Sequence, residues 1–164
     1  ALKTLGINKI IVIDKESEKS RAMEFGAWEF IGSHGKNGVA GVKDKIRAAA
    51  GDMADAVFIC TDSPMGRNVA RRFMKNSGSI CEMGFLCGWR RTPTARYFED
   101  SMPAGGRFYA ARDYENCMNF LAKAAEMKLP LYKLITHRYK LEEINEAMWT
   151  VVREEGLGIA VFNR

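Results

Sequence analysis

Two short apolar runs constrain the fold of this chain more than any other feature. Residues 10–13 (Ile-Ile-Val-Ile) and 56–60 (Ala-Val-Phe-Ile-Cys) consist almost entirely of apolar side chains and are bounded by polar residues. Continuous runs of this kind are typical of strands in a parallel sheet, because helices cover both faces of such a sheet and neither face meets water. A weaker run at residues 79–83 predicts a third strand, and residues 28–31 are a further candidate strand.

Helices are predicted between these strands. Segments 17–25 and 39–50 have helical patterns, and each is followed by a glycine, Gly26 or Gly51, where the C-terminal cap of a helix belongs. A third helix is predicted at residues 65–76. Parallel neighbours need crossover connections of this kind. The expected fold is therefore α/β, with a Rossmann-like parallel sheet and flanking helices over the first half of the chain.

The second half of the sequence changes character. Residues 85–106 form the longest stretch without a periodic pattern, and loops of that length are usually functional, interfacial or disordered. A further strand is expected at residues 107–111 and a helix at residues 113–127. The tail after them predicts a separate structural layer, with an extended piece at residues 134–139, an amphipathic helix at 141–152 and a last strand at 158–162.

Composition limits the classes of function. With 164 residues, of which 47% are hydrophobic, the chain can bury one core. No apolar run approaches the roughly 20 residues that a membrane span needs. The opening residues do not resemble an export signal, so a cytoplasmic location is expected.

The net charge of +5 permits an anionic partner. The basic clusters around Arg71 and Arg90 are interpreted as solvated surface, with nucleic-acid binding as the less favoured alternative.

The cysteines and histidines do not form a metal-binding pattern. His34 lies in a glycine-rich turn, and His137 has no partner at ligand spacing. We therefore predict neither a metal ligand nor a catalytic residue in this chain. The cysteines lack C-x-x-C spacing and are interpreted as buried or incidental thiols: Cys60, Cys81, Cys87 and Cys117.

An acidic residue, Asp14, directly follows the first apolar run. In dinucleotide-binding folds an acid at this place hydrogen-bonds the adenosine ribose, about 20 residues beyond a glycine-rich fingerprint. The opening residues resemble the last turn of a helix capped by Gly6, so we expect that fingerprint upstream of Ala1. Taken alone, an aspartate after a strand is more often a turn or helix cap. The glycines at residues 32–38 have the wrong spacing for a phosphate loop, and an ordinary turn is expected there.

The order of these segments resembles the medium-chain, zinc-type alcohol and sorbitol dehydrogenases. The most specific stretch is residues 133–147 (KLITHRYKLEEINEA), and IIVID, ADAVFICTDSP, GSICEMGF and GLGIAVF match as well. In that family the cofactor domain is inserted into a split catalytic domain. The resemblance implies that residues 1–111 are most of an NAD-binding Rossmann domain, without its first strand and glycine loop. Residues 112–164 would then return to the catalytic domain.

The resemblance also implies which residues contact the cofactor. Asp14 would bind the ribose and repel a 2′-phosphate, so NAD is favoured over NADP. Asp62 departs from the family pattern, because many relatives have glycine there. The implied cofactor-binding residues are Asp14, Lys15, Lys19, Cys60, Thr61, Gly84 and Phe85.

The function implied by the resemblance is hydride transfer between an alcohol or carbonyl substrate and a nicotinamide cofactor. The family's zinc ligands precede the cofactor domain, so zinc is expected only outside this sequence, and this segment by itself is expected to be inactive. Residues 101–111 would form a homodimer contact. The alternative is a non-catalytic nucleotide-binding or interaction module, because a fold does not fix a function.

Overall fold

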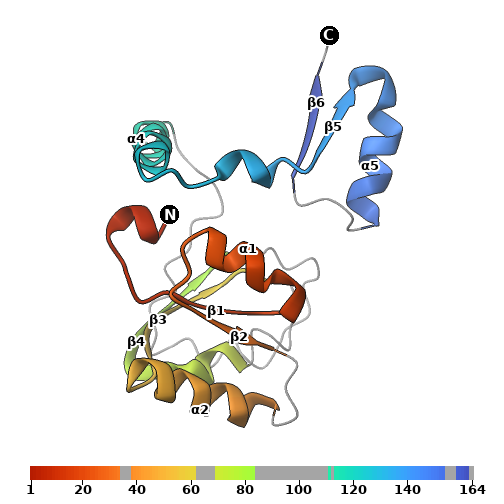
Figure 1. The fold of residues 1–164 in the computed structure, drawn as a ribbon. Coiled ribbons are helices and arrows are strands. Elements are labelled where there is room, and N and C mark those ends of the chain that lie inside the picture. Colours follow the sequence, from red (N-terminus) through yellow and green to blue (C-terminus); the bar gives the residue numbers. More distant parts are fainter. Residues whose placement is uncertain (34–37, 62–68, 84–110, 112, 154–157, 163–164) are drawn as a thin grey trace. The chain divides into compact units, whose positions relative to one another are not determined.

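The computed structural model describes residues 1–33, 38–61, 69–83, 111, 113–153 and 158–162 (Figure 1). The chain divides into two compact units. One consists of Ile7–Glu115, and the other combines Ala1–Gly6 with Asn116–Arg164. The predicted boundary between residues 111 and 112, and the roles assigned to the two parts, remain predictions.

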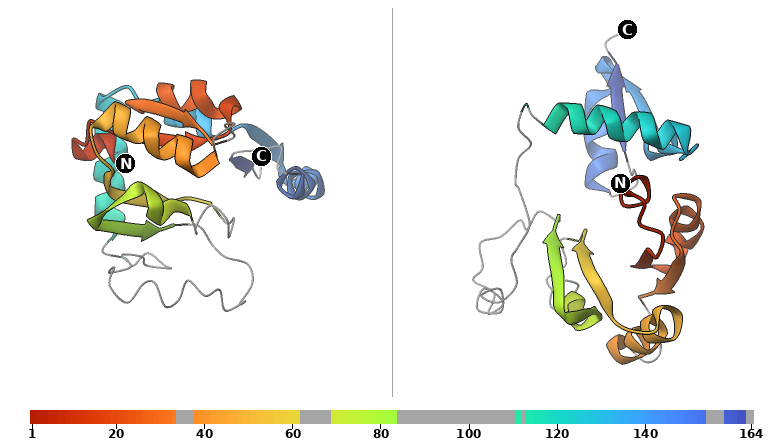
Figure 2. Two further views of the ribbon diagram at one scale, coloured as in Figure 1. Left: turned by 90° about the horizontal axis from the view of Figure 1, so that it is seen from below. Right: turned by 90° about the vertical axis from the view of Figure 1, so that its left-hand side faces the viewer.

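The unit Ile7–Glu115 alternates strands and helices, so the α/β class is confirmed. β1 pairs with β2 in parallel, and β3 pairs with β4 in parallel. Figure 2 shows β3 and β4 side by side. The elements of this unit are β1 (Ile11–Asp14), η2 (Glu16–Glu18), α1 (Lys19–Glu24), β2 (Glu29–Gly32), α2 (Gly38–Ala50), β3 (Ala54–Ile59), η3 (Arg71–Phe73) and β4 (Met74–Glu82).

The core of this unit lies between α2 and the strands. Val42 and Ile46 stand four residues apart on α2, on the same face of the helix, and both are buried. They belong to one cluster with Ile31 of β2 and with Phe73. The helical spacing of the apolar residues in α2 therefore turns one stripe toward the sheet and leaves the charged residues at the surface.

The glycines predicted to end the first two helices do so. Gly26 and Gly51 have φ angles of 92° and 86°, in the left-handed region that side chains with a Cβ rarely adopt. The backbone N–H of Gly51 donates to the carbonyl of Arg47 at 2.8 Å, which satisfies a carbonyl at the end of α2. These two caps confirm the predicted ends of the helices.

The predicted helix at residues 65–76 is wrong over its last part. Residues 62–68 lie outside the described part, and from Met74 onward the chain is strand β4. Met74 pairs with Ala54, and after a register shift Ser79 pairs with Ala56. The segment is therefore a strand despite its helical sequence pattern. Pairing with β3 satisfies its backbone N–H and C=O groups.

Gly78 fits this irregular part of the β3–β4 ladder because it has no side chain. A Cβ there would stand 2.9 Å from the carbonyl oxygen of Asp55 and 2.3 Å from Cγ of Met74. We expect Gly78→Ala to lower the free energy of unfolding by about 1–2 kcal/mol, because the methyl group must push backbone apart. Urea unfolding followed by circular dichroism measures the change. Gly51→Asn is the comparison, because asparagine tolerates the left-handed cap; an equal loss in both variants would contradict the steric explanation.

A surface ion pair joins the starts of β3 and β4. Lys75 Nζ lies 2.8 Å from Asp55 Oδ1 and 3.6 Å from Asp52 Oδ2. The hydrogen bond and the charge of Lys75 hold the pKa of Asp55 below its ordinary value. The hydrogen bond to Asp55 likewise raises the pKa of Lys75.

The ion pair predicts a pH-dependent effect of Lys75→Met. Because the folded pKa of Asp55 is lowered, its stabilising contribution is present above the unfolded pKa, near 4, and is lost as the pH falls through the folded value. The variant should therefore have a lower melting temperature than the parent at pH 7, and the difference should shrink toward pH 3. Lys45→Met, at an exposed position of α2, is the matched control. A difference that does not change with pH would contradict this explanation.

The second unit contains the predicted tail elements. β5 (His137–Lys140) pairs in parallel with β6 (Ile159–Phe162), and η6 (Leu141–Glu143) and α5 (Ile144–Val152) connect them. α5 lies on β5, where the Tyr139 hydroxyl and Thr150 Oγ1 are 2.7 Å apart. The unit also includes η1 (Lys3–Leu5), most of α4 (Asp113–Glu126) and η5 (Leu131–Leu134).

The apolar face predicted for residues 113–127 is exposed rather than buried. Tyr114, Met118 and Leu121 of α4 are 71%, 55% and 47% exposed. The helical pattern correctly predicted the element, but a pattern does not say which other segment covers its apolar side. The predicted strand at residues 107–111 lies outside the described residues, except for Ala111, which is in a turn.

Candidate functional site

The carboxyl ends of β1 and β2 form the first edge at which predicted cofactor residues lie. Asp14 ends β1 and pairs with Gly32, which ends β2. The backbone N–H of Ser33 donates to the carbonyl of Asp14 at 2.7 Å and extends the ladder by one step. Ligands of open α/β sheets bind at the carboxyl ends of parallel strands. This edge is therefore a candidate binding site on geometric grounds.

Asp14 presents an exposed carboxylate at this edge. Its Oδ1 accepts a hydrogen bond of 2.7 Å from the backbone N–H of Lys15, the next residue. This bond holds the carboxylate at the turn that follows β1. The two interpretations of Asp14 from the sequence, a ribose-binding acid and a turn residue, are therefore compatible. The side chain forms a turn contact, and a carboxylate fixed in this way can accept hydrogen bonds from a pair of ribose hydroxyls.

One residue that sequence reasoning missed, Glu16, lies at the same edge of the sheet as Asp14. Glu16 is the first residue of η2, and its Oε2 lies 2.6 Å from the position that a Cβ on Gly32 would occupy. Its Oε1 is 3.8 Å from Nζ of Lys19. An acid two residues after Asp14 was visible in the sequence. The contact with Gly32 was not, because it depends on the register between β1 and β2.

The carboxyl end of β3 carries the second pair of predicted residues, Cys60 and Thr61. Both are exposed, and the backbone N–H of Met83 donates to the carbonyl of Ile59 at 2.9 Å just before them. Partial burial and the neighbouring Cys81 raise the pKa of Cys60. A raised pKa disfavours the thiolate, so this thiol is not suited to nucleophilic attack. Gly84, Phe85 and Asp62 lie outside the described residues.

The described cysteines are free thiols, and not all of them are buried. Cys60 and Cys117 are exposed, while Cys81 is half-buried. Of the two interpretations, buried or incidental, only the second suits Cys60 and Cys117, because Cys60 lies at a strand end and Cys117 on the exposed side of α4. Cys87 lies outside the described residues. Within the described ranges, no three His, Cys, Asp or Glu side chains gather in a way that could hold a metal ion.

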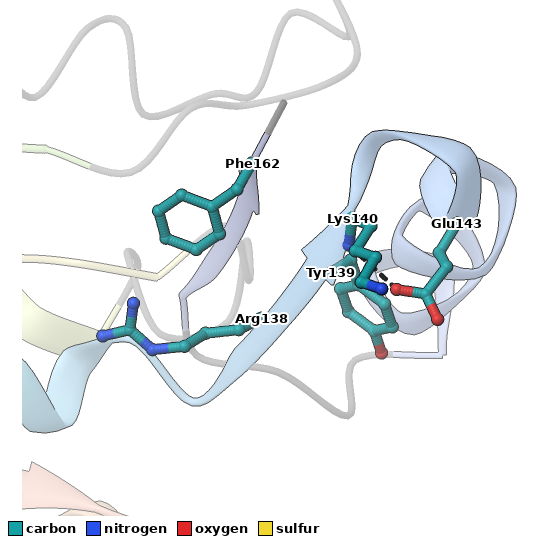
Figure 3. A pocket seen from close by; sticks show the side chains of 5 residues that line it. All are labelled: Arg138, Tyr139, Lys140, Glu143 and Phe162. Carbon is teal, nitrogen blue, oxygen red and sulfur yellow. Dashed lines mark hydrogen bonds between the residues drawn. The ribbon is translucent and has the colours of Figure 1, made fainter. Parts of the chain in front are cut away.

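A shallow hollow on the second unit contains none of the predicted cofactor residues. Arg138, Tyr139, Lys140, Glu143 and Phe162 line its volume of about 400 Å³ (Figure 3). The guanidinium of Arg138 lies 5.6 Å from the centre of the Phe162 ring. Glu143 Oε2 accepts the backbone N–H of Lys140 at 2.8 Å, as a cap of the following helix. These contacts give the lining residues structural roles within β5, β6 and η6.

His137 has structural partners on β5. Its Nδ1 lies 3.0 Å from Thr136 Oγ1, and its ring stacks at 6.3 Å on the ring of Tyr139. These contacts orient the imidazole along the strand. His34 lies outside the described residues. None of the helices in the described ranges is long and apolar enough to cross a membrane.

Comparisons with known proteins extend these observations. No family model matches the chain. Sorbitol dehydrogenase 1 of Saccharomyces cerevisiae is 26% identical over 150 residues, which cover 88% of this chain and 41% of the yeast protein. Sorbitol dehydrogenase 2 of the same yeast gives the same values. The chain is thus similar to sorbitol dehydrogenases over most of its own length. It spans less than half the length of these relatives.

Solved dehydrogenase structures have the same fold. An alcohol dehydrogenase from Thermotoga maritima superposes with a TM-score of 0.80 at 18% identity, over 98% of this chain and 44% of that one. The 2R,3R-butanediol dehydrogenase of Bacillus subtilis gives 0.70 at 22% identity, over 100% of this chain and 46% of that one. An alcohol dehydrogenase of Escherichia coli CFT073, solved with NADH, gives 0.69 at 18% identity over 98% and 47%. Together with the similarity to the yeast sorbitol dehydrogenases, this shared fold confirms the predicted resemblance to alcohol and sorbitol dehydrogenases.

Proposed function

We propose that this chain is part of an NAD-dependent dehydrogenase that acts on an alcohol or polyol. The observation that carries the proposal is the exposed Asp14 carboxylate at the carboxyl end of β1, fixed by the N–H of Lys15. In a dinucleotide-binding fold this place belongs to the acid that binds the ribose diol. The likeness to the yeast sorbitol dehydrogenases supports a polyol or another small alcohol as the substrate.

The strand pairing supports the Rossmann assignment of residues 1–111. Among the described strands, β1 bonds only to β2 and β3 only to β4. In the Rossmann strand order, the first strand lies between the second and the fourth. If β1 to β4 are the second to fifth strands of that order, the first strand belongs between β1 and β3. Residues 112–164 are proposed to return to the catalytic domain, and residues 101–111 to form a homodimer contact.

The described residues fit a bound NAD on its adenosine side. Asp14 would accept the ribose hydroxyls, with Lys15 and Lys19 beside it, while Cys60 and Thr61 would flank the cofactor at the end of β3. Gly84 and Phe85 are proposed to approach the nicotinamide. NAD, when bound, supplies the hydride acceptor. In this proposal the chain's own part is to bind and orient the cofactor.

Zinc is proposed to belong to the dehydrogenase outside this chain. A zinc-dependent alcohol dehydrogenase of Streptococcus pneumoniae is among the solved structures with this fold, with a TM-score of 0.68 at 18% identity. The described residues do not offer three gathered donor groups, so they do not fit a zinc site. No step of the reaction is therefore assigned to a metal on this chain. The dehydrogenase is also proposed to be cytoplasmic.

The test is a binding titration followed by an activity screen on the protein as the cell makes it. We expect NAD to bind more tightly than NADP, and NAD reduction with sorbitol, butanediol or a related alcohol. Binding of NAD without turnover of any alcohol or polyol would favour the non-catalytic nucleotide-binding module. Failure to bind either nucleotide would overturn the proposal.

A further inference from the structure

The carboxylate of Glu16 lies over the end of the neighbouring strand β2. Its carboxylate lies where the side chain of residue 32 would be, with Oε2 2.6 Å from the position of a Cβ on Gly32. A carboxylate can lie there only because residue 32 has no side chain. The register pairs Gly32 with Asp14, so both carboxylates lie at the same strand end.

Glu16 also changes what the nearby lysine can do. Glu16 is 72% exposed and Lys19 is 58% exposed, with 3.8 Å between Glu16 Oε1 and Lys19 Nζ. Without Glu16, Lys19 would lose this anionic partner and could attract a phosphate. With Glu16 in place, its charge is partly compensated. Glu18, in the same turn, pairs instead with Arg21.

We propose that Glu16 is a second residue that determines cofactor specificity, acting together with Asp14 against NADP. This inference rests on the proposed function, because it places the adenosine ribose on Asp14. A 2′-phosphate on that ribose would meet two carboxylates and a lysine that already has an anionic partner. Like charges disfavour such a complex, whereas NAD carries no charge at this position. Gly32 contributes to this preference for NAD over NADP, because its missing side chain leaves room for the Glu16 carboxylate.

The decisive variant is Glu16→Gln, which keeps the shape of the side chain and removes its charge. We expect it to tighten NADP binding roughly three- to tenfold, because an exposed charge acts through partly screened Coulomb forces. NAD binding should change less than about twofold. Glu18→Gln is the matched control, since it removes one charge from the same turn but from a carboxylate that pairs with Arg21.

A second variant moves the charge without removing it. Gly32→Ala places a methyl group where the Glu16 carboxylate lies, and the exposed end of that side chain can shift away. It should also tighten NADP binding relative to NAD, by less than Glu16→Gln does. Raising the salt concentration from 50 mM to 500 mM should reduce the effect of both variants, because exposed charges are screened.

The measurement is the dissociation constant of each nucleotide, from protein fluorescence or calorimetry, on the protein as the cell makes it. A larger gain for Glu16→Gln than for Glu18→Gln supports the inference. If the protein binds NAD but the NAD to NADP ratio is the same in Glu16→Gln and the parent, the inference is wrong and the proposed function stands. If the parent binds neither nucleotide, the proposed function fails and the inference fails with it.

Discussion

Replacing Ile46 by alanine should give the largest loss of stability among single changes in the unit Ile7–Glu115. Ile46 is 2% exposed and packs in one cluster with Ile31 and Phe73. Removing its branched side chain leaves a cavity between α2 and β2 that the helix cannot close without moving. Such substitutions cost about 2–5 kcal/mol in free energy of unfolding. Urea unfolding of the parent and the variant, followed by circular dichroism, measures the difference.

The control for Ile46→Ala is Lys45→Ala, one residue earlier on the same helix. Lys45 is exposed, and alanine and lysine have similar helix propensities, so this change should alter stability by less than about 0.5 kcal/mol. A loss below about 1 kcal/mol for Ile46→Ala would mean that α2 does not pack on the sheet as described. Because Ile31 directly precedes Gly32 on β2, Ile46→Ala should also weaken nucleotide binding at that edge.

The elements of this fold could be predicted because most of them have a local sequence signal. The strand β1 is a continuous apolar run, and α2 has an apolar stripe with a glycine after its last residue. β4 was predicted only in its last part, because Met74 and Lys75 continue a helical pattern. Their strand conformation depends on pairing with β3, more than 15 residues earlier in the chain, and local propensity does not include such partners.

Of the candidate site, the sequence predicted individual residues at strand ends but not the contacts between them. Asp14 is recognisable because it follows an apolar run, and Cys60 because it ends another. The contact between Glu16 and Gly32 requires the register of β1 against β2, which a shift of one residue would abolish. Burial was the least predictable property. Met118 has the spacing of a core residue but is 55% exposed. The sequence of a helix does not determine which other segment covers its apolar face.

Replacing Asp14 by alanine should produce the largest loss of cofactor binding. Hydrogen bonds to a charged group contribute about 1.5–3 kcal/mol each, so losing the carboxylate from the ribose should weaken NAD binding by roughly 10- to 150-fold. The protein should remain folded, because Asp14 is exposed and its only described side-chain bond is to the N–H of Lys15. Titration of both variant and parent with NAD, next to their unfolding curves, separates binding from stability.

Two further variants decide why binding is lost. Asp14→Asn keeps an oxygen that can accept the Lys15 N–H but removes the charge, so its loss of NAD affinity should be smaller than that of Asp14→Ala. It should also bind NADP less poorly than the parent does, because a negative charge no longer faces the 2′-phosphate. Asp44→Ala, which removes an exposed acid from α2, should leave both affinities unchanged. If Asp14→Ala weakens NAD binding less than threefold, or no more than Asp44→Ala does, the ribose lies elsewhere and Asp14 is only the turn residue that ends β1.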